Sequence, residues 1–342
     1  MTAGRTATDP TGDHSAGSRR RVGGLARPLL SLLAAAVCVA AVTLLARTAV
    51  GTASGQRLDE LALSGALAHE GRLAQYAELA VGTVSLPVIA VLLALSLVLV
   101  LVRGRWRLLL PLAVLVAGAN LTTQVVKHFL VSREPLGLGI EITPNSFPSG
   151  HTTLAATAVI ALVLASGGAR AVLAPLGTAW TASAGIGTVV LGWHRPSDVL
   201  GALVLVAAWT FLVLALDGLG TRRRLARSAR RTGHGRRRRG APGADVAGPD
   251  GSTGPLLRLR TSAVDSVVAL LLALAGLAGL GVGGYELVSL QLPLDLQDGA
   301  QQATAFSAMA AVIGGCTAAW MALVLLLRTP ISHRTRPGER VP

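Results

Sequence analysis

The sequence is poor in cysteine, in charged residues and in aromatic residues. Cys38 and Cys316 each lie inside an apolar run, and no Cys/His cluster has the spacing of metal ligands, so neither a disulfide framework nor a zinc site is predicted. Only 14% of the 342 residues are charged, whereas 51% are hydrophobic. The apolar residues are gathered into long runs, which is typical of a polytopic membrane protein and not of a soluble domain with a large core.

The arginines behind the net charge of +14 are clustered just outside the apolar runs. The clusters are Arg19 to Arg21, Arg103, Arg105, Arg107, the run from Arg222 to Arg239, Arg328, Arg334 and Arg336. In a soluble protein this charge would suggest nucleic acid, but no aromatic residues are interleaved with the arginines as stacking platforms. The positive-inside rule explains the clusters, so no nucleic-acid partner is predicted.

The apolar runs predict an all-α, polytopic transmembrane helix bundle. At ~20 residues a span, the eight candidates are 29–46, 81–102, 108–126, 152–166, 172–192, 197–216, 263–284 and 303–327. The first is short and alanine-rich behind a basic head, so it could instead be a signal sequence. With the N-terminus inside, every strong arginine cluster falls on the cytoplasmic side. The chain is therefore expected in the cell membrane with both termini cytoplasmic.

Composition divides the chain into two membrane units joined by a linker. The expected parts are a basic cytoplasmic tail (1–26), a six-span core (27–218), a linker (219–261), a two-span hairpin (262–328) and a cytoplasmic tail (329–342). The linker mixes arginine with Gly, Pro and Ser and is predicted to be disordered. In the hairpin, Gly279 and Gly283 favour close helix packing; a homodimer contact and a partner-docking site are both compatible with it. Residues 55–80 could form a helix on the outer surface or a solvated loop.

Polar islands interrupt the apolar runs at the loops predicted to lie outside. They are VVKHFLVSREPLG around Lys127 and Arg133, NSFPSGHTT at 145–153, and GWHRPSDVL at 192–200. In the second island Ser149 is placed to cap the next helix, so the amides of Gly150 and His151 belong to an unsatisfied helix N-terminus. Such a terminus binds phosphate well. With the lysine and the arginine it would form an electropositive cradle for phosphate.

Two histidines in these islands could supply the chemistry of phosphate transfer. Pro196 suits the first turn of the helix that follows it, which places Asp198 within reach of His194. One histidine can attack phosphorus while a carboxylate orients it, and the other can protonate the departing oxygen. The islands are separated by apolar helices, yet on one membrane face they can converge above a helical bundle.

Lys127 through Arg133 and Pro135, PSGH at 148–151, and His194 with Asp198 occur in this order, separated by apolar helices. They resemble the three signature motifs of the type 2 phosphatidic acid phosphatase superfamily, integral-membrane lipid phosphatases with a vanadium-haloperoxidase-like core. The resemblance covers roughly residues 27–218. It implies hydrolysis of a lipid phosphate or diphosphate, such as a phospholipid or polyprenyl phosphate, at the extracytoplasmic face.

The resemblance also implies a role for each matching residue. His194 would be the nucleophile that forms a phosphohistidine, Asp198 its orienting partner and His151 the general acid. The groups implied to bind the phosphoryl oxygens are Lys127, Arg133, Ser149 and Gly150. The resemblance implies neither a metal nor another cofactor.

Two positions depart from the family pattern. Glu134 stands between Arg133 and Pro135, where the family has arginine directly before proline, and Thr188 stands where the family has an arginine six residues before the nucleophile. One phosphate-binding cation is therefore missing, and Arg195 is a candidate to replace it.

Two other function classes stay open. The departures are compatible with a catalytically impaired member that binds lipid phosphate. Eight spans would also suit a lipid transporter, although ionisable residues are absent from the centres of the spans.

Overall fold

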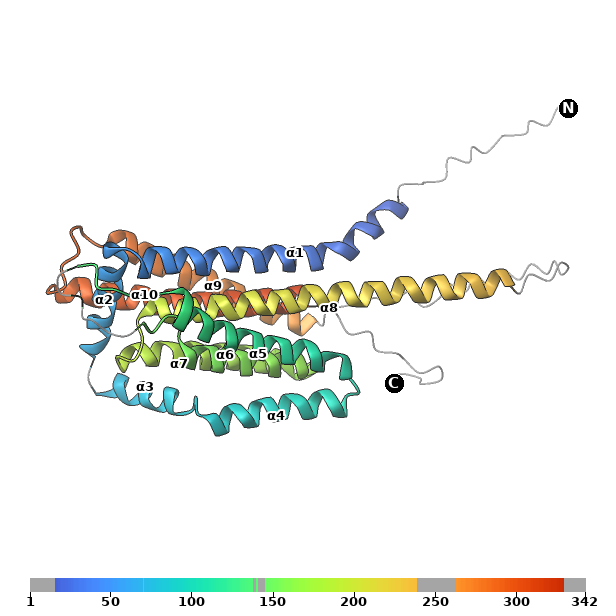
Figure 1. Cartoon of the computed structure of the whole chain (residues 1–342), viewed down its shortest axis with the longest axis horizontal. Coiled ribbons are helices and arrows are strands. Elements are labelled where there is room, and N and C mark those ends of the chain that lie inside the picture. The colour runs from blue at the N-terminus through green and yellow to red at the C-terminus, as the bar shows by residue number, and fades with distance from the viewer. Residues whose placement is uncertain (1–15, 70, 138–139, 141–144, 239–262, 329–342) are drawn as a thin grey trace, which may run out of the picture.

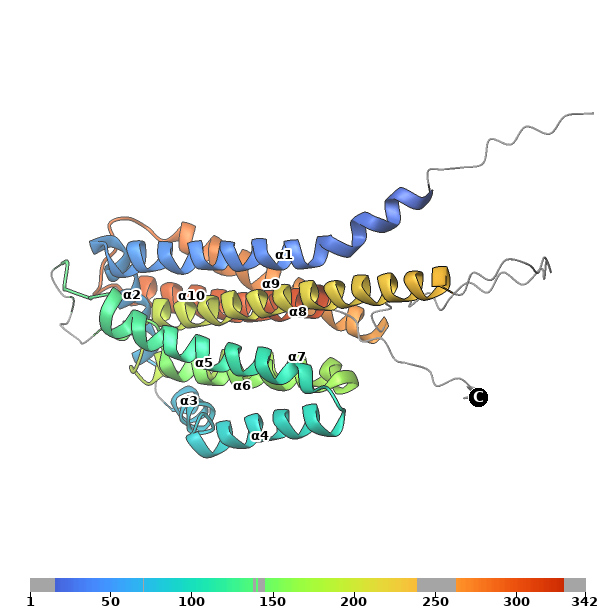
Figure 2. The ribbon, with the colours of Figure 1, turned by 45° about the vertical axis from the view of Figure 1, so that its right-hand side comes forward.

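The computed structural model describes residues 16–69, 71–137, 140, 145–238 and 263–328, and regular structure in these ranges is helical. The longer helices are α1 (Ala16–Leu45), α2 (Ala53–Leu67), α3 (Arg72–Gly82), α4 (Leu86–Val102), α5 (Leu109–Val125), α6 (Gly150–Ala165), α7 (Arg170–Val190), α8 (Pro196–Arg238), α9 (Ala263–Ser289) and α10 (Gly299–Leu327). Short π or 3-10 turns are η1 (Ala46–Val50), η2 (Trp106–Leu108), η3 (Val126–Leu130) and η4 (Gly167–Ala169). The long helices lie side by side along one direction (Figures 1 and 2). The prediction of an all-α polytopic bundle is confirmed.

By length and apolar composition alone, fewer helices qualify as membrane spans than the eight predicted. Helices occupy all eight predicted segments, but among the described residues five helical segments are long and apolar enough to span by themselves. They are Leu25–Val50, Trp106–Leu130, Pro196–Gly220, Ala263–Ser289 and Gly299–Leu327. Helices α3 and α4, bent by 52°, qualify together as a sixth.

Helices α6 and α7 fall short for different physical reasons. With 16 residues, α6 is about 24 Å long, less than the ~30 Å of a hydrocarbon core. Helix α7 has 21 residues, but glycine, serine and threonine dilute its apolar character. Most of α6 is buried against other helices, so it packs on protein and not on lipid.

Helix α8 is the central element of the bundle. It packs against α1, α5, α6, α7 and α10, and 78% of its membrane-length segment is buried, compared with 11% for α1. Outer helices such as α1 and α4 therefore expose leucine and valine side chains, as expected where helices face lipid. Cys38 of α1 and Cys316 of α10 are both free and half-buried.

The C-terminal hairpin packs closely and joins the core. A Cβ atom on Gly279 would lie 2.8 Å from the carbonyl oxygen of Ala311, and one on Gly315 would lie 2.7 Å from the amide of Leu280. The small residues thus let α9 and α10 approach closely, as the sequence predicts. Helix α10 also packs against α2, α7 and α8. The small-residue faces are used within the chain, and a homodimer stays a prediction.

Arginines of the α4–α5 and α6–α7 connections and of the end of α10 meet at one end of the bundle. Figure 1 shows α2 at the other end. Asp265 at the start of α9 pairs with Arg170 at 3.0 Å and with Arg328 at 2.5 Å. Arg105 donates to the carbonyl of Leu164 near the end of α6. This grouping agrees with the positive-inside reasoning, while the assignment of each end to a membrane face stays a prediction.

Two predicted boundaries differ from the observed helices. Helix α8 continues to Arg238, into the segment 219–261 that the sequence predicts to be a disordered linker. Arginine, alanine and leucine are good helix formers, so this stretch can extend a helix that has already begun. Helix α1 begins at Ala16, inside the predicted tail 1–26. The rest of the linker and the tail 329–342 lie outside the described residues.

Candidate active site

The PSGH island begins α6 at the end of the bundle where α2 lies. Ser149 is the N-cap of α6, and its hydroxyl accepts a hydrogen bond from the amide of Thr152 at 3.3 Å. The backbone amide of Ser149 donates to the carbonyl of Asp198 at 2.9 Å. This bond joins the second island directly to the first turn of α8. A Cβ atom on Gly150 would meet no other atom within 4 Å, so open space lies beside the helix terminus.

His194 and Asp198 flank the start of α8, as the sequence predicts. Their closest atoms, Nδ1 of His194 and Oδ2 of Asp198, are 3.5 Å apart. Nδ1 is buried and has no hydrogen-bond partner among the described residues. The two side chains are therefore adjacent, but the distance is too long for a formed hydrogen bond. Catalytic hydrogen bonds are often long in the free enzyme and tighten when substrate binds.

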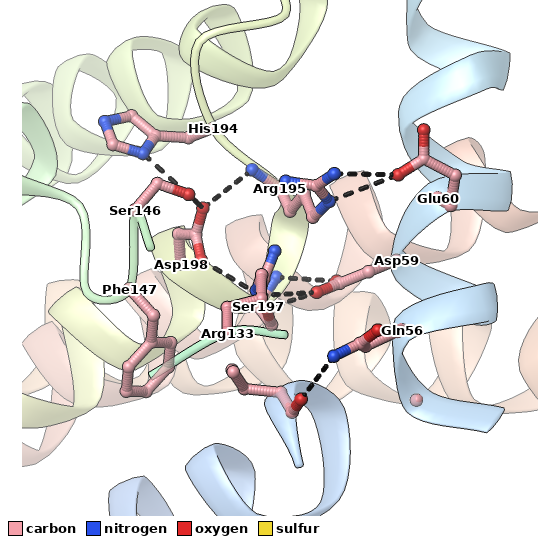
Figure 3. Close-up of polar contacts among 12 residues, drawn as sticks. Gln56, Asp59, Glu60, Arg133, Ser146, Phe147, His194, Arg195, Ser197 and Asp198 are labelled. Carbon is pink, nitrogen blue, oxygen red and sulfur yellow. Dashed lines mark hydrogen bonds and ion pairs between the residues drawn. The ribbon is translucent and has the colours of Figure 1, made fainter. Parts of the chain in front are cut away.

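The carboxylate of Asp198 is fully buried and surrounded by donors (Figure 3). Oδ2 accepts the hydroxyl of Ser146 at 2.5 Å and the backbone amide of Arg195 at 2.9 Å. Oδ1 lies 3.3 Å from a terminal nitrogen of Arg133. A buried charge is tolerated when it is paired and hydrogen-bonded in this way. The carboxylate is therefore held in one orientation toward His194.

The two site histidines lie close together. The ring centroids of His151 and His194 are 6.2 Å apart with an edge-on geometry, and Trp193 lies 5.4 Å from His151. His151 is at the tip of α6, which is not among the candidate spans. Burial, and then the charges of His194 and Lys127, lower the pKa of His151. Its proton is therefore released more easily than that of a free imidazole.

The first island reaches the site through the end of α5 and the chain after it. Lys127 lies in η3, and its carbonyl accepts the side-chain amide of Asn145 at 3.0 Å. The same amide binds the carbonyl of Val131 at 2.6 Å, which ties the first island to the loop before PSGH. The side chain of Arg133 is 5% exposed and contacts Asp198. The structure thus brings residues of all three islands to one end of the bundle.

Comparison with known proteins assigns this region to a family. Residues 88–219 match the family model of the PAP2 superfamily. These residues belong to the PAP2 superfamily. No curated protein and no solved structure matches the chain. The PAP2 region contains every residue that the sequence predicts for the site, and it leaves out α1, α2, α3 and the C-terminal hairpin.

Helix α2, outside the PAP2 region, contributes residues that sequence reasoning missed. Oδ2 of Asp59 lies 3.2 Å from a terminal nitrogen of Arg133, and Oε2 of Glu60 lies 2.9 Å from one of Arg195. Consecutive acids of one helix thus hold both arginines that the sequence assigns to phosphate (Figure 3). The sequence predicts either a surface helix or a solvated loop over 55–80 and does not indicate which residues this segment would contact.

Arg195 extends from the start of α8 toward α2 and away from the ring of His194 (Figure 3). Its Nε and one terminal nitrogen both donate to Glu60. Contact with a substrate phosphate would require this pair to open, so replacement of the missing family arginine by Arg195 stays a prediction. At the position of that arginine, Thr188 is buried and its carbonyl accepts the amides of Trp193 and His194.

The extra acid of the first island lies beside the contact between the first island and α2. Glu134 is exposed, and its carbonyl accepts the side-chain amide of Gln56 at 2.7 Å. The oxygen of the same side chain accepts the amide of Leu136 at 3.0 Å. Gln56 of α2 therefore fixes the chain on both sides of Pro135. Within the described ranges, no group of three His, Cys, Asp or Glu side chains is arranged to hold a metal ion.

Proposed function

We propose that this protein is a membrane phosphatase that hydrolyses a lipid phosphate or diphosphate through a phosphohistidine intermediate. Membership of residues 88–219 in the PAP2 superfamily implies phosphatase activity on lipid-type phosphates. The observation that carries the mechanism is the 6.2 Å separation of the His151 and His194 rings beside the buried Asp198. Reacting atoms meet at about 3–3.5 Å, so one phosphoryl group between the rings can touch both.

In the first step, Nε2 of His194 attacks phosphorus. A nitrogen–phosphorus bond forms as the bond to the leaving oxygen breaks, and His151 gives its proton to that oxygen. Asp198 stabilises the positive charge on the ring of His194 and holds its Nδ1 proton. The hydrogen bonds to Asp198 from Ser146 and the backbone of Arg195 keep the carboxylate in place during the step.

In the second step, water attacks the phosphohistidine. His151 takes the proton of the water, inorganic phosphate leaves, and both histidines return to their starting states. The amides at the start of α6, together with Lys127 and Arg133, stabilise the charge on the phosphoryl oxygens throughout. Open space beside Gly150 supports a phosphate seat at this terminus.

The site is proposed to face the extracytoplasmic side. Arg103, Arg105, Arg170 and Arg328 meet at the opposite end of the bundle, where the positive-inside rule favours the cytoplasm. The substrate is a lipid whose phosphate reaches this end, and a phospholipid and a polyprenyl phosphate both meet this requirement.

Phosphate release by the purified full-length protein tests the proposal. Phosphatidic acid and a polyprenyl diphosphate in mixed micelles would be offered to wild type, His194→Ala and His128→Ala. His128 is an exposed histidine of η3 bonded to Gln124, and serves as the matched control. We expect release by wild type and His128→Ala, and a loss of at least a thousandfold in His194→Ala.

The intermediate gives a second measurement. Brief incubation with substrate labelled in the phosphate should leave acid-labile label on wild type and none on His194→Ala. If wild type and His194→Ala were equally silent on every substrate while lipid phosphate still bound, the protein would be a lipid-phosphate binder and the enzyme proposal would be abandoned.

A further inference from the structure

The side chain of Arg133 is 5% exposed, and only part of its guanidinium is hydrogen-bonded. One terminal nitrogen contacts Asp59, Ser197 and Asp198 at 3.1–3.3 Å. The other terminal nitrogen and Nε are buried and have no hydrogen-bond partner in the described part of the chain. Buried donors left without partners are costly, so two donors of this arginine are available to an anion that enters with the substrate.

Asp59 joins this arginine to the helix that carries the nucleophile's partner. One carboxylate oxygen accepts from Arg133 and from the hydroxyl of Ser197, and the other accepts the backbone amide of Ser197 at 3.0 Å. Ser197 directly precedes Asp198 in the first turn of α8. Asp59 is 1% exposed, so these contacts are made away from solvent.

We propose that Asp59 is a positioning residue of the phosphatase site, which anchors Arg133 for the phosphoryl oxygens and keeps Asp198 available to His194. The inference rests on the proposed function and adds to it a residue of α2, outside the PAP2 region. Asp59 acts through Arg133 and is not assigned a contact with substrate.

The carboxylates of Asp59 and Asp198 compete for the guanidinium of Arg133, and this competition is how Asp59 would position the arginine. Arginine prefers two parallel bonds to one carboxylate. Without the charge of Asp59, the guanidinium of Arg133 is free to turn and bind Asp198 with two nitrogens. That movement would use the donors that otherwise remain for phosphate and would draw Asp198 from His194. Asp59 prevents this movement because it binds the terminal nitrogen of Arg133 that also contacts Asp198.

Helix α2 is fixed well enough to serve as such an anchor. Thr52 caps its N-terminus and accepts the amide of Gly55 at 3.1 Å. Gly65 packs so closely on the carbonyl of Gln302 in α10 that a Cβ there would lie 2.1 Å from that oxygen. Gln56 ties α2 to the chain beside Arg133. The C-terminal hairpin therefore supports the site through α2.

Asp59→Asn in the full-length protein tests the proposal, with Glu78→Gln as control. Glu78 is an exposed acid of α3, so its substitution removes the same charge from the same end of the chain. Loss of one charge-assisted contact slows turnover by about 10–100-fold. We expect kcat/KM of Asp59→Asn to fall within that range, the inhibition constant of inorganic phosphate to rise about tenfold, and Glu78→Gln to match wild type.

A double-mutant cycle separates positioning from a general structural role. In an Arg133→Ala background, Asp59→Asn should change kcat/KM by less than about twofold, since the group it positions is gone. If the two losses multiply, Asp59 does not act through Arg133 and the inference is overturned. A fall in Tm of Asp59→Asn with an unchanged phosphate inhibition constant overturns it as well.

Phosphate binding gives a test that does not depend on turnover. Inorganic phosphate should raise the Tm of wild type, because a ligand of the folded state stabilises it. The concentration needed should be about tenfold higher for Asp59→Asn. If no variant hydrolyses any lipid, the proposed function fails while this measurement still decides on Asp59. An equal or absent shift in wild type and Asp59→Asn refutes the anchor.

Discussion

Gly201 of α8 links the packing of the core to the position of the PSGH island. A Cβ atom at Gly201 would lie 2.3 Å from Cε2 of Phe147 and 2.6 Å from its Cζ. Phe147 is fully buried against Gly201, so an added Cβ must displace its ring. Because Phe147 immediately precedes Pro148 and Ser149, a shift of its ring is passed to the N-cap of α6.

The size of the effect follows from these distances. Carbon atoms in contact prefer about 3.5–4.0 Å, so Gly201→Ala requires Phe147 and α8 to separate by about 1 Å or more. Overpacking of this kind costs about 1–3 kcal/mol of the free energy of unfolding, partly offset by ~1 kcal/mol from the better helix propensity of alanine. A misplacement of ~1 Å at a catalytic group can lower kcat about 100-fold. We therefore expect a large loss of kcat with a small change in stability.

The assay compares phosphate release and Tm of Gly201→Ala with those of Gly220→Ala. Gly220 lies on the same helix, and a Cβ there would meet nothing within 4 Å. The control should keep full activity and an equal or higher Tm. Combining Gly201→Ala with Phe147→Leu should restore activity, because the smaller side chain removes the overlap. Full kcat in Gly201→Ala alone would show that Phe147 does not transmit packing to the site.

Two further predictions concern the acids of α2. Burial is the main cause that raises the pKa of Asp59 to about 6; Arg133 lowers it and Asp198 raises it. Asp59 should therefore become protonated as pH falls through about 6, which weakens its ion pair with Arg133. The ratio of wild-type to Asp59→Asn kcat/KM should decline over that range, and a constant ratio would contradict the assignment. Dividing the two profiles removes the titration that both variants share, such as that of His151. Because the folded state binds this proton more tightly than the unfolded state, Asp59 makes stability fall as pH rises from about 4 to 6, and Asp59→Asn should flatten that slope in Tm. Glu60→Gln weakens the ion pair between Glu60 and Arg195. If Arg195 binds the substrate phosphate, the KM of this variant should fall severalfold. An unchanged or higher KM would show that Arg195 instead holds α2 in place.

Much of the fold could be predicted because hydrophobicity is a local property of the sequence. Each apolar run became a helix, since a chain in lipid must satisfy its backbone hydrogen bonds within the segment. The number of spans was harder to predict. Helices α6 and α7 are partly shielded from lipid by their neighbours, and apolar content alone does not reveal which helices are interior.

The candidate site could be predicted only where its residues lie in short sequence motifs. The N-cap Ser149 and the spacing of His194 and Asp198 depend on one turn of helix each, and both are observed. Asp59 and Glu60 lie in a segment without a motif. Their pairing with Arg133 and Arg195 spans more than seventy residues of chain, so no local pattern could indicate it.

The sequence by itself determined the membrane class and the helices, and it predicted the residues proposed for phosphate chemistry, because these depend on composition and on contacts within a turn of helix. Tertiary structure alone decided how those residues are held. Packing of α10 on α2 brings Asp59 and Glu60 to the arginines, and Phe147 against Gly201 fixes the start of α6. Such long-range contacts depend on the shape and charge of surfaces that exist only after the helices have assembled.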